Sequence, residues 1–198
     1  MPLPHDAFSE QSDEALLAAY GKGDGAAARA LTARLCPRML GYAQRMLHDQ
    51  FEAEDVVQEA MLRLWKIAPE WRVGEARVTT WLFRVVTNLC TDRLRSRGGG
   101  RRTVGLDGVA EPADPARPAL AGLAQAERLA ALIEALSRLP ARQRQAVVLR
   151  HIEGLSNPEI GAVMGIGTEA VESLTARGKR GLSNILAGRR EELGYEDD

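Results

Sequence analysis

The segment from Gly98 to Pro118 restricts most strongly how this chain can fold. It holds three consecutive glycines at 98–100, followed at intervals by Pro112, Pro115 and Pro118. A continuous helix or strand does not tolerate this combination, because proline lacks a backbone donor and glycines have no side chains to pack. A stretch of this length without regular structure is also unusual inside one compact domain. The sequence therefore predicts two modules, residues 12–97 and 120–190, joined by a flexible linker over residues 98–119.

Apolar residues on both sides of the linker recur at helical spacing, and the alternation typical of strands is missing. Only 5% of the 198 residues are aromatic, whereas alanine, leucine, arginine and glutamate are abundant. This composition favours helices over a sandwich or a barrel. We therefore predict an all-α fold made of two small helical modules.

The N-terminal module is expected to contain several helices in succession. Ser12 or Asp13 is placed to cap the first helix, and the second is expected to bend or break at Pro37. The third should run from about Glu52 to Ile67, and the fourth should start near Thr79 and end at the glycine triplet. Shorter helices are expected in the C-terminal module.

Charged residues are segregated along a chain whose formal net charge is only −1. Acids gather at Glu52, Glu54, Asp55 and Glu59, whereas bases gather between Arg93 and Arg102 and again at Arg177, Lys179 and Arg180. Such runs are often no more than solvated faces. Their alternation favours separate acidic and basic surfaces for partners.

Two cysteines, Cys36 and Cys90, show no metal-ligand spacing, which suits buried or inert thiols in a reducing compartment. The first nine residues lack the basic-then-apolar order of a signal peptide, and no apolar run is long enough to span a bilayer. We therefore expect a cytoplasmic protein without membrane insertion, and we expect no cofactor.

Near the C-terminus the sequence predicts a helix-turn-helix. Ser156 and Glu159 have the spacing of a capping box, with Pro158 in the first turn of a short helix. A glycine turn, 165–167, ends that helix, and Thr168 is placed to cap a longer one whose apolar stripe is Val171, Leu174, Leu182 and Ile185. This arrangement is the scaffold that places a helix in the major groove.

The outward side of the longer helix would carry Thr168, Glu169, Glu172, Ser173, Ala176, Arg177 and Arg180. The N-terminal residues of this side would face base edges, whereas Arg177, Lys179 and Arg180 would meet phosphates. A plain helical hairpin is the alternative. Glu169 and Glu172 place negative charge near the phosphates, and Gly178 and Gly181 each destabilise the helix by about 1 kcal/mol relative to alanine.

Three further motifs carry a resemblance to a known family. Residues 53–65, AEDVVQEAMLRLW, closely resemble the polymerase-binding helix of bacterial sigma factors. Residues 81–95 resemble their promoter-melting helix, which reads the −10 element, and residues 139–144 and 153–160 resemble the entry to their −35-reading module. The order of the motifs and the linker between them are similar to the small extracytoplasmic-function group.

The resemblance implies that the helix over 53–65 binds the clamp helices of the largest subunit of core RNA polymerase. The residues implied in that contact are Asp55, Gln58, Glu59, Leu62 and Trp65. One apolar stripe of this helix consists of Ala53, Val56, Val57, Ala60 and Leu64. A second stripe consists of Gln58, Met61, Leu62 and Trp65, so one stripe can face the module's own core and the other a partner. A helix buried on both sides is the alternative.

The resemblance also implies contacts with promoter DNA at the −10 element. The residues implied there are Arg72, Trp81, Arg84, Asn88, Asp92 and Arg95. Asn88 can pair with a base edge, whereas the arginines neutralise phosphate. The loop from Trp71 to Thr79 resembles the family's pocket for a flipped base, and Trp81 is either a stacking platform or a core anchor for its helix. Val78, Leu82, Val85, Val86 and Leu89 are expected to point inward.

The match departs from the family pattern in the −35-reading helix. Many relatives carry a basic residue near Glu172 and alanine at Gly178. The promoter sequence therefore does not follow from the resemblance. An anti-sigma factor is a further partner that the resemblance implies.

Alternatives from other classes remain at this point. A metal enzyme is one, because His48 lies near several acids, but the Glu-x-x-His motif of carboxylate sites in helical bundles does not occur. We therefore expect neither a catalytic nor a metal site. A regulator that binds operators without polymerase explains residues 152–187 but not residues 53–65. An adaptor that binds only proteins is the third alternative.

Overall fold

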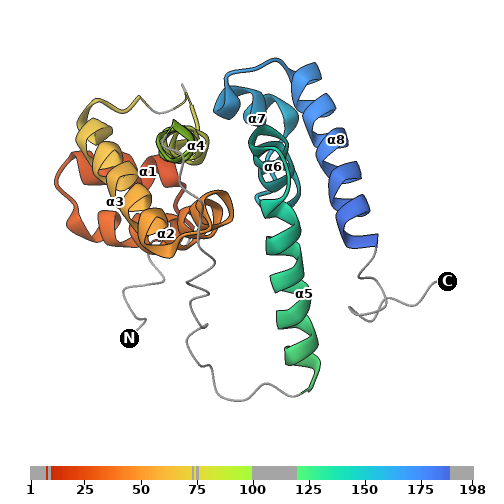
Figure 1. Cartoon of the computed structure of the whole chain (residues 1–198). Coiled ribbons are helices and arrows are strands. Elements are labelled where there is room, and N and C mark those ends of the chain that lie inside the picture. Colours follow the sequence, from red (N-terminus) through yellow and green to blue (C-terminus); the bar gives the residue numbers. More distant parts are fainter. Residues whose placement is uncertain (1–7, 9, 73, 75, 100–119, 188–198) are drawn as a thin grey trace. The chain divides into compact units, whose positions relative to one another are not determined.

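The computed structural model describes residues 8, 10–72, 74, 76–99 and 120–187 of the chain. It divides into two compact units, the first formed chiefly by the residues up to Gly99 and the second by most of the residues after it. The part that it describes is helical and contains no strand, which confirms the all-α prediction (Figure 1). Most of the expected linker, residues 100–119, lies outside the described residues.

The first unit is a bundle of four helices. They are α1 (Asp13–Gly21), α2 (Gly25–Leu47), α3 (Gln50–Ile67) and α4 (Val78–Gly99), and the short 3-10 turn η2 (Ala68–Glu70) follows α3. Polar side chains start three of these helices. The Oγ of Ser12 accepts from the amide of Ala15 at 3.2 Å, and Asp24 and Asp49 cap α2 and α3 in the same manner. These bonds satisfy backbone donors that have no partner inside the helix.

The core of the first unit lies where α2 crosses the other helices. Tyr42 of α2 is fully buried; its hydroxyl lies 2.8 Å from Oγ1 of Thr87, and its ring packs edge-on against Phe83 with centroids 5.4 Å apart. Both partners belong to α4, so this contact fixes α4 against α2. Leucines from α1 and α2 complete the core, among them Leu16, Leu17, Leu31 and Leu35.

Arg97 fastens the end of α4 to the corner between α2 and α3. Its Nη1 donates to the carbonyl of Leu47 at 3.1 Å, Nη2 pairs with Asp49 at 3.1 Å, and Nε donates to Glu52 at 3.2 Å. The planar guanidinium donates along several directions at once, which a lysine cannot do. The Arg97 side chain therefore links α4 to α3 and to the end of α2 at this end of the bundle.

Some expectations for the first unit are wrong. The helix break offered as one outcome at Pro37 does not occur: α2 continues through this residue, which lies on the exposed side while Leu35 and Met39 beside it are buried in the core. Met61, expected to belong to the second stripe with Gln58, Leu62 and Trp65, is buried. Val85 is only half-buried.

The second unit contains four α-helices and one π-helical turn among its described residues. They are α5 (Leu120–Ser137), α6 (Ala141–Val147), the π-turn η3 (Val148–Ile152), α7 (Asn157–Met164) and α8 (Thr168–Ala187). α8 packs against α6 and lies beside α5, as Figure 1 shows. Leu136, Leu139, Val147, Leu149 and Val171 are among the buried residues of this unit.

The predicted capping box of α7 is confirmed. The amide and the hydroxyl of Ser156 both donate to Oε2 of Glu159, at 2.8 and 2.6 Å. The predicted cap of α8 is wrong by one residue. The carbonyl of Gly167 accepts from the amide of Val171 at 3.1 Å, so Gly167 precedes the helix and Thr168 is its first residue.

Two glycines let α8 approach its neighbours closely. A Cβ on Gly178 would overlap Cγ2 of Val147 and lie 3.1 Å from the carbonyl oxygen of Gln143. A Cβ on Gly181 would lie 2.7 Å from Cδ2 of Leu139. The low helix propensity of these glycines is therefore matched by close packing, since only a residue without a side chain fits here.

Candidate nucleic-acid interface

One side of α3 carries exposed residues along most of its length. Phe51, Asp55, Gln58 and Leu62 are four, three and four residues apart, so they project from the same side of the helix. We call these four residues the α3 face. The exposed fractions of Phe51 and Leu62 are 81% and 61%, which is unusual for large apolar side chains. The opposite side of α3 is buried, so the alternative of a helix buried on both sides is wrong.

Phe51 is the residue of this face that the sequence prediction missed. Its spacing from Asp55 is the signal that could have identified it. The expected helix began at about Glu52, whereas α3 begins at Gln50 after its Asp49 cap. Phe51 therefore lies inside the helix and continues the exposed side.

Of the two remaining residues predicted for polymerase binding, Trp65 continues the spacing of the α3 face, three residues after Leu62, whereas Glu59 lies beside that face. Glu59 is half-buried and forms an ion pair with Arg63 one turn later. Trp65 is also half-buried, and its ring packs edge-on against Tyr20 of α1 with centroids 4.8 Å apart. Contacts within the first unit therefore cover part of the Trp65 ring, and this part is not available to a partner.

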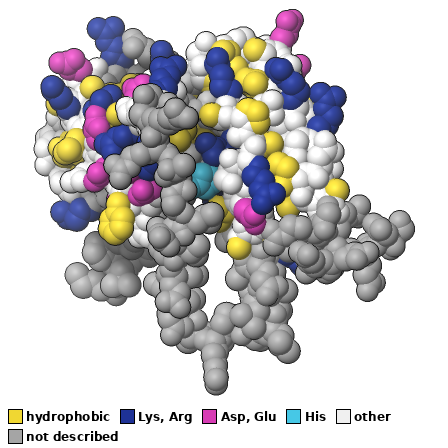
Figure 2. All heavy atoms as spheres, in the orientation of Figure 1, with side chains coloured by type: hydrophobic (Ala, Val, Ile, Leu, Met, Phe, Trp, Pro, Cys, Tyr) yellow, Lys and Arg dark blue, Asp and Glu magenta, His cyan; other side chains and the backbone are white. Residues whose placement is uncertain are grey.

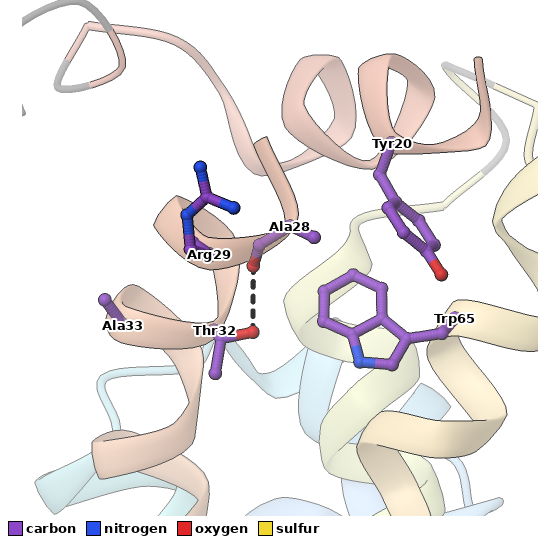
Figure 3. Close-up of a pocket in the computed structure, with 6 residues that line it drawn as sticks. All are labelled: Tyr20, Ala28, Arg29, Thr32, Ala33 and Trp65. Atoms are coloured by element: carbon purple, nitrogen blue, oxygen red, sulfur yellow. Dashed lines mark hydrogen bonds between the residues drawn. The ribbon is translucent and has the colours of Figure 1, made fainter. Parts of the chain in front are cut away.

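Trp65 also lines a hollow of about 370 Å³ between α1, α2 and α3 (Figure 3). The residues around it are Tyr20, Ala28, Arg29, Thr32, Ala33 and Trp65. In Figure 3 the two aromatic rings lie on one side of the hollow and the α2 residues on the other. The hydroxyl of Thr32 is directed to the carbonyl of Ala28 at 2.8 Å, so the hollow offers chiefly apolar surface and the Arg29 guanidinium.

The exposed side of α4 consists of Arg84, Asn88, Asp92 and Arg95, which we call the α4 face. All four predicted residues are exposed, as their helical spacing indicates. Asp92 lies 3.8 Å from Arg95 in an exposed ion pair, so the acid partly offsets one of the two cations. Asn88 lies between Arg84 and Asp92 in this row and is exposed.

Two tryptophans pack together near the start of α4, Trp81 from the helix itself and Trp71 from the end of η2. Trp81 is half-buried, and its ring packs edge-on against Trp71 with centroids 6.2 Å apart. The indole nitrogen of Trp71 is buried and has no hydrogen-bond partner in the part of the chain that the structure describes. An unsatisfied buried donor costs about 1–3 kcal/mol. Arg72 next to it is exposed.

The outward side of α8 contains every residue predicted there. Its first two turns present Thr168, Glu169, Glu172, Ser173 and Ala176, which we call the α8 face, and all five are exposed. Arg177, Lys179 and Arg180 follow and are exposed as well. The Nε of Arg177 donates to the carbonyl of Ser173 at 3.2 Å, which holds that side chain along the helix.

The surroundings of His151 report on the charge near this basic end. Partial burial, together with the positive charges of Lys179 and Arg150, lowers the pKa of His151. Lys179 of α8 and Arg150 of the π-turn η3 therefore both lie near His151. Figure 2 shows that, on the visible side, Lys and Arg side chains are dispersed among hydrophobic and uncharged ones.

The side chains of α7 and α8 meet through one hydrogen bond that the sequence did not predict. The Nδ2 of Asn157, the first residue of α7, donates to Oε1 of Glu172 at 3.1 Å. This bond connects the start of the first helix of the motif to the second turn of the second helix.

No group of three or more His, Cys, Asp or Glu side chains is arranged to hold a metal ion in the portion of the chain covered by the structure. Among those same residues, none of the helices combines the length and apolar character needed to cross a membrane.

Models of two known protein families match this chain, at residues 31–99 and 129–182. A model described as Sigma-70 region 2 matches residues 31–99, which include α3 and α4. A model described as Sigma-70, region 4 matches residues 129–182, which include α7 and most of α8.

Among known proteins, the chain is 35% identical to the ECF RNA polymerase sigma factor SigM of Mycobacterium tuberculosis. That match covers 89% of this chain and 86% of the relative. The RNA polymerase sigma-H factor of Pseudomonas aeruginosa is 30% identical, with coverage of 90% and 96%.

Two solved structures share the fold. CnrH, determined in complex with the cytosolic domain of CnrY, matches with a TM-score of 0.67 and 26% identity over 90% of this chain and 99% of that one. The sigma factor RpoE of Bartonella quintana, determined with the anti-sigma factor NepR, matches with a TM-score of 0.63 and 24% identity over 79% and 94% of the two chains.

Proposed function

The chain belongs to the extracytoplasmic-function sigma factors of bacterial RNA polymerase, and we propose that its two units divide promoter recognition between them. Residues 12–97 bind core polymerase and open the −10 element, residues 98–119 act as the linker, and residues 120–190 grip −35 DNA. The observation that carries this proposal is that α3, α4 and α8 each expose a separate row of residues within the matched segments.

The α3 face is the proposed contact with the clamp helices of the largest polymerase subunit. Two exposed apolar residues flank Asp55 and Gln58 on one side of a helix. Interfaces of this kind combine apolar anchors with polar groups that fix the register. Glu59 and Trp65 extend the contact at its edge. Trp65 contributes less surface because Tyr20 covers part of its ring.

The α4 face is the proposed contact with the −10 element. Asn88 can donate and accept at a base edge, while Arg84, Arg95 and Arg72 neutralise phosphates. A base drawn out of the stack must recover a few kcal/mol through stacking and hydrogen bonds. The remaining surface of Trp81 supports that stacking.

The α8 face is the proposed reader of −35 DNA. The α8 face carries short or acidic side chains that fit between base edges, whereas Arg177 and Arg180 follow within about one turn of its last residue and meet phosphates. Because the basic residues follow the reading residues along one helix, a single docking orientation satisfies both contacts.

The proposal also covers regulation and chemistry. An anti-sigma factor is the regulatory partner that the family resemblance implies, and the complex of CnrH with the cytosolic domain of CnrY supports a bound protein partner.

Promoter recognition requires no covalent step. In this proposal the chain therefore acts as a transcription factor in the cytoplasm and not as an enzyme, and it needs no metal or cofactor.

Transcription from fragmented genomic DNA tests the proposal directly. Core polymerase of the same bacterium plus this chain is expected to initiate at a narrow promoter set, which sequencing of the transcripts would define. The double variant Asp55→Ala/Gln58→Ala should bind core at least about tenfold more weakly while unfolding at an unchanged temperature. Glu134→Ala on α5 is the control, because Glu134 is exposed and distant in sequence from α3.

The outcomes separate the competing functions. Failure of core plus the chain to initiate on any fragment contradicts the sigma-factor function. Binding to defined DNA sites without core-dependent initiation favours an operator-binding regulator instead. Unchanged core affinity in the double variant removes the assignment of the α3 face while leaving the DNA contacts in place.

A further inference from the structure

The hydrogen bond between Asn157 and Glu172 orients a carboxylate on the proposed DNA-reading side of α8. Oε1 of Glu172 accepts from Nδ2 of Asn157 at 3.1 Å, and among the described residues this is the bond that the structure gives to the Glu172 carboxylate. Glu172 remains exposed, so Oε2 is open to a donor outside the chain. A side chain fixed at one atom loses less rotamer freedom when it binds through the other.

Glu172 occupies the part of α8 that faces bases rather than phosphates in the proposed function. Ser173 and Ala176 beside it are short and uncharged, and the basic residues begin at Arg177. A carboxylate among phosphates is unfavourable unless it receives a hydrogen bond that compensates the repulsion. Asn157 supplies one such bond to Oε1, and a donor from the DNA to the open Oε2 would compensate the repulsion further.

The chemistry of base edges restricts which base can supply that donor. A carboxylate only accepts hydrogen bonds. In the major groove guanine presents two acceptors, thymine presents an acceptor and a methyl group, and adenine places its N7 acceptor beside its amino group. Cytosine presents the N4 amino group without a neighbouring acceptor, and it is the base that Glu and Asp contact in direct readout.

We propose that Glu172, positioned by Asn157, makes the −35 contact of this chain selective for cytosine at one position. The inference rests on the proposed function, since it requires α8 to lie in the major groove. Glu172 contacts the base, and Asn157 is a positioning residue that acts through Glu172. The carboxylate of Glu172 weakens nonspecific binding to the phosphates, and in this proposal the same carboxylate makes the contact selective for one base.

A randomised −35 library tests this selectivity with the complete holoenzyme. Templates carry a fixed −10 element from a promoter found by genomic transcription, and the transcripts are sequenced. Wild-type holoenzyme is expected to prefer cytosine over guanine at one position by about tenfold or more. Glu172→Gln should reduce that preference to about twofold at the same position and leave the others unchanged, because an amide both donates and accepts. Glu134→Gln is the matched control and should leave every position unchanged.

Two further measurements distinguish base contact from a bracing role in the fold. Asn157→Ala should weaken the preference at the same position only. A general drop in transcription across all positions, with a lower unfolding temperature, contradicts the positioning role. In the second measurement, wild-type holoenzyme transcribes a template whose selected cytosine is replaced by 2-pyrimidinone, which lacks the amino group. Its activity should fall to the level of the guanine template.

The proposal is overturned if no position prefers cytosine, if Glu172→Gln retains the preference, or if removing the amino group has no effect. These results leave the proposed function intact as long as transcription depends on the −35 element. A wild-type holoenzyme that transcribes every −35 sequence equally contradicts the −35 function of α8, and this inference with it.

Discussion

Cγ2 of Val147 occupies the space that a Cβ on Gly178 would need. The backbone carbonyl of Gln143 closes the same space from α6 at 3.1 Å. α8 therefore lies against α6 at a distance that only glycine permits, and this contact sets the position of the α8 face on the second unit.

Gly178→Ala should destabilise the second unit, although alanine ordinarily favours helices over glycine by about 1 kcal/mol. Overpacking of a filled contact costs about 1–3 kcal/mol, and part of the obstruction is backbone, which cannot rotate away. Thermal unfolding followed by circular dichroism should show a transition that is lower by a few degrees. Gly25→Ala is the control, since its Cβ would meet only the Arg29 side chain at 3.8 Å. An unchanged or higher unfolding temperature for Gly178→Ala would contradict this prediction, because it would show that α6 and α8 can move apart without loss of stability.

Phe51→Ala should weaken binding to core polymerase without destabilising the first unit. The side chain is 81% exposed, so it contributes little to the core and offers most of its surface to a partner. Removal of an aromatic anchor from an interface typically costs about 1–2 kcal/mol or more, which is about tenfold in Kd. Fluorescence titration with core polymerase measures the loss. Lys22→Ala, an exposed position at the end of α1, serves as the control, and equal affinities for the two variants would exclude Phe51 from the interface.

Asn88→Ala should reduce discrimination among −10 sequences while the fold stays intact, because Asn88 is exposed on α4. Loss of a paired hydrogen bond to one base costs about 1–3 kcal/mol of discrimination. A randomised −10 library transcribed by the holoenzyme measures the preference at each position. Asn184→Ala makes the same substitution at an exposed position of α8 and should leave the −10 preference unchanged. A variant that retains its full base preference would remove Asn88 from the reading residues.

The thiol of Cys36 should react slowly with alkylating agents at neutral pH. Burial raises the pKa of this thiol above its ordinary value, so the reactive thiolate is scarcer than in a free cysteine at the same pH. The rate should keep rising with pH beyond the point at which free cysteine levels off. Mass spectrometry after timed exposure to iodoacetamide measures Cys36 and Cys90 separately. Cys90 is fully buried and should react only on unfolding. If Cys36 reacted at the rate of a free thiol at neutral pH, its pKa would not be raised and the prediction would be wrong.

The local signals along the chain determined much of the secondary structure and the exposed sides. The spacing of Arg84, Asn88, Asp92 and Arg95 placed them on one side of a helix, and the structure has all four exposed. The capping box at Ser156 and Glu159 also followed from sequence alone. These predictions succeed because helical periodicity and capping depend on residues three or four apart.

Other features depended on contacts between residues far apart in sequence. Pro37 lies inside α2 because core packing on both sides of it compensates for the lost hydrogen bond, which local propensity does not report. Phe51 belongs to the exposed side of α3 because the helix begins at Gln50, directly after its Asp49 cap.

The sequence by itself therefore determined the helical class and which residues line the exposed sides of α4 and α8, since these follow from helical periodicity. Only the tertiary structure decided why Gly178 is a glycine, how much of Trp65 is covered by Tyr20, and that Asn157 holds Glu172. Each of these is a contact between separate helices, and its geometry is set by how the helices pack and not by the identity of neighbouring residues.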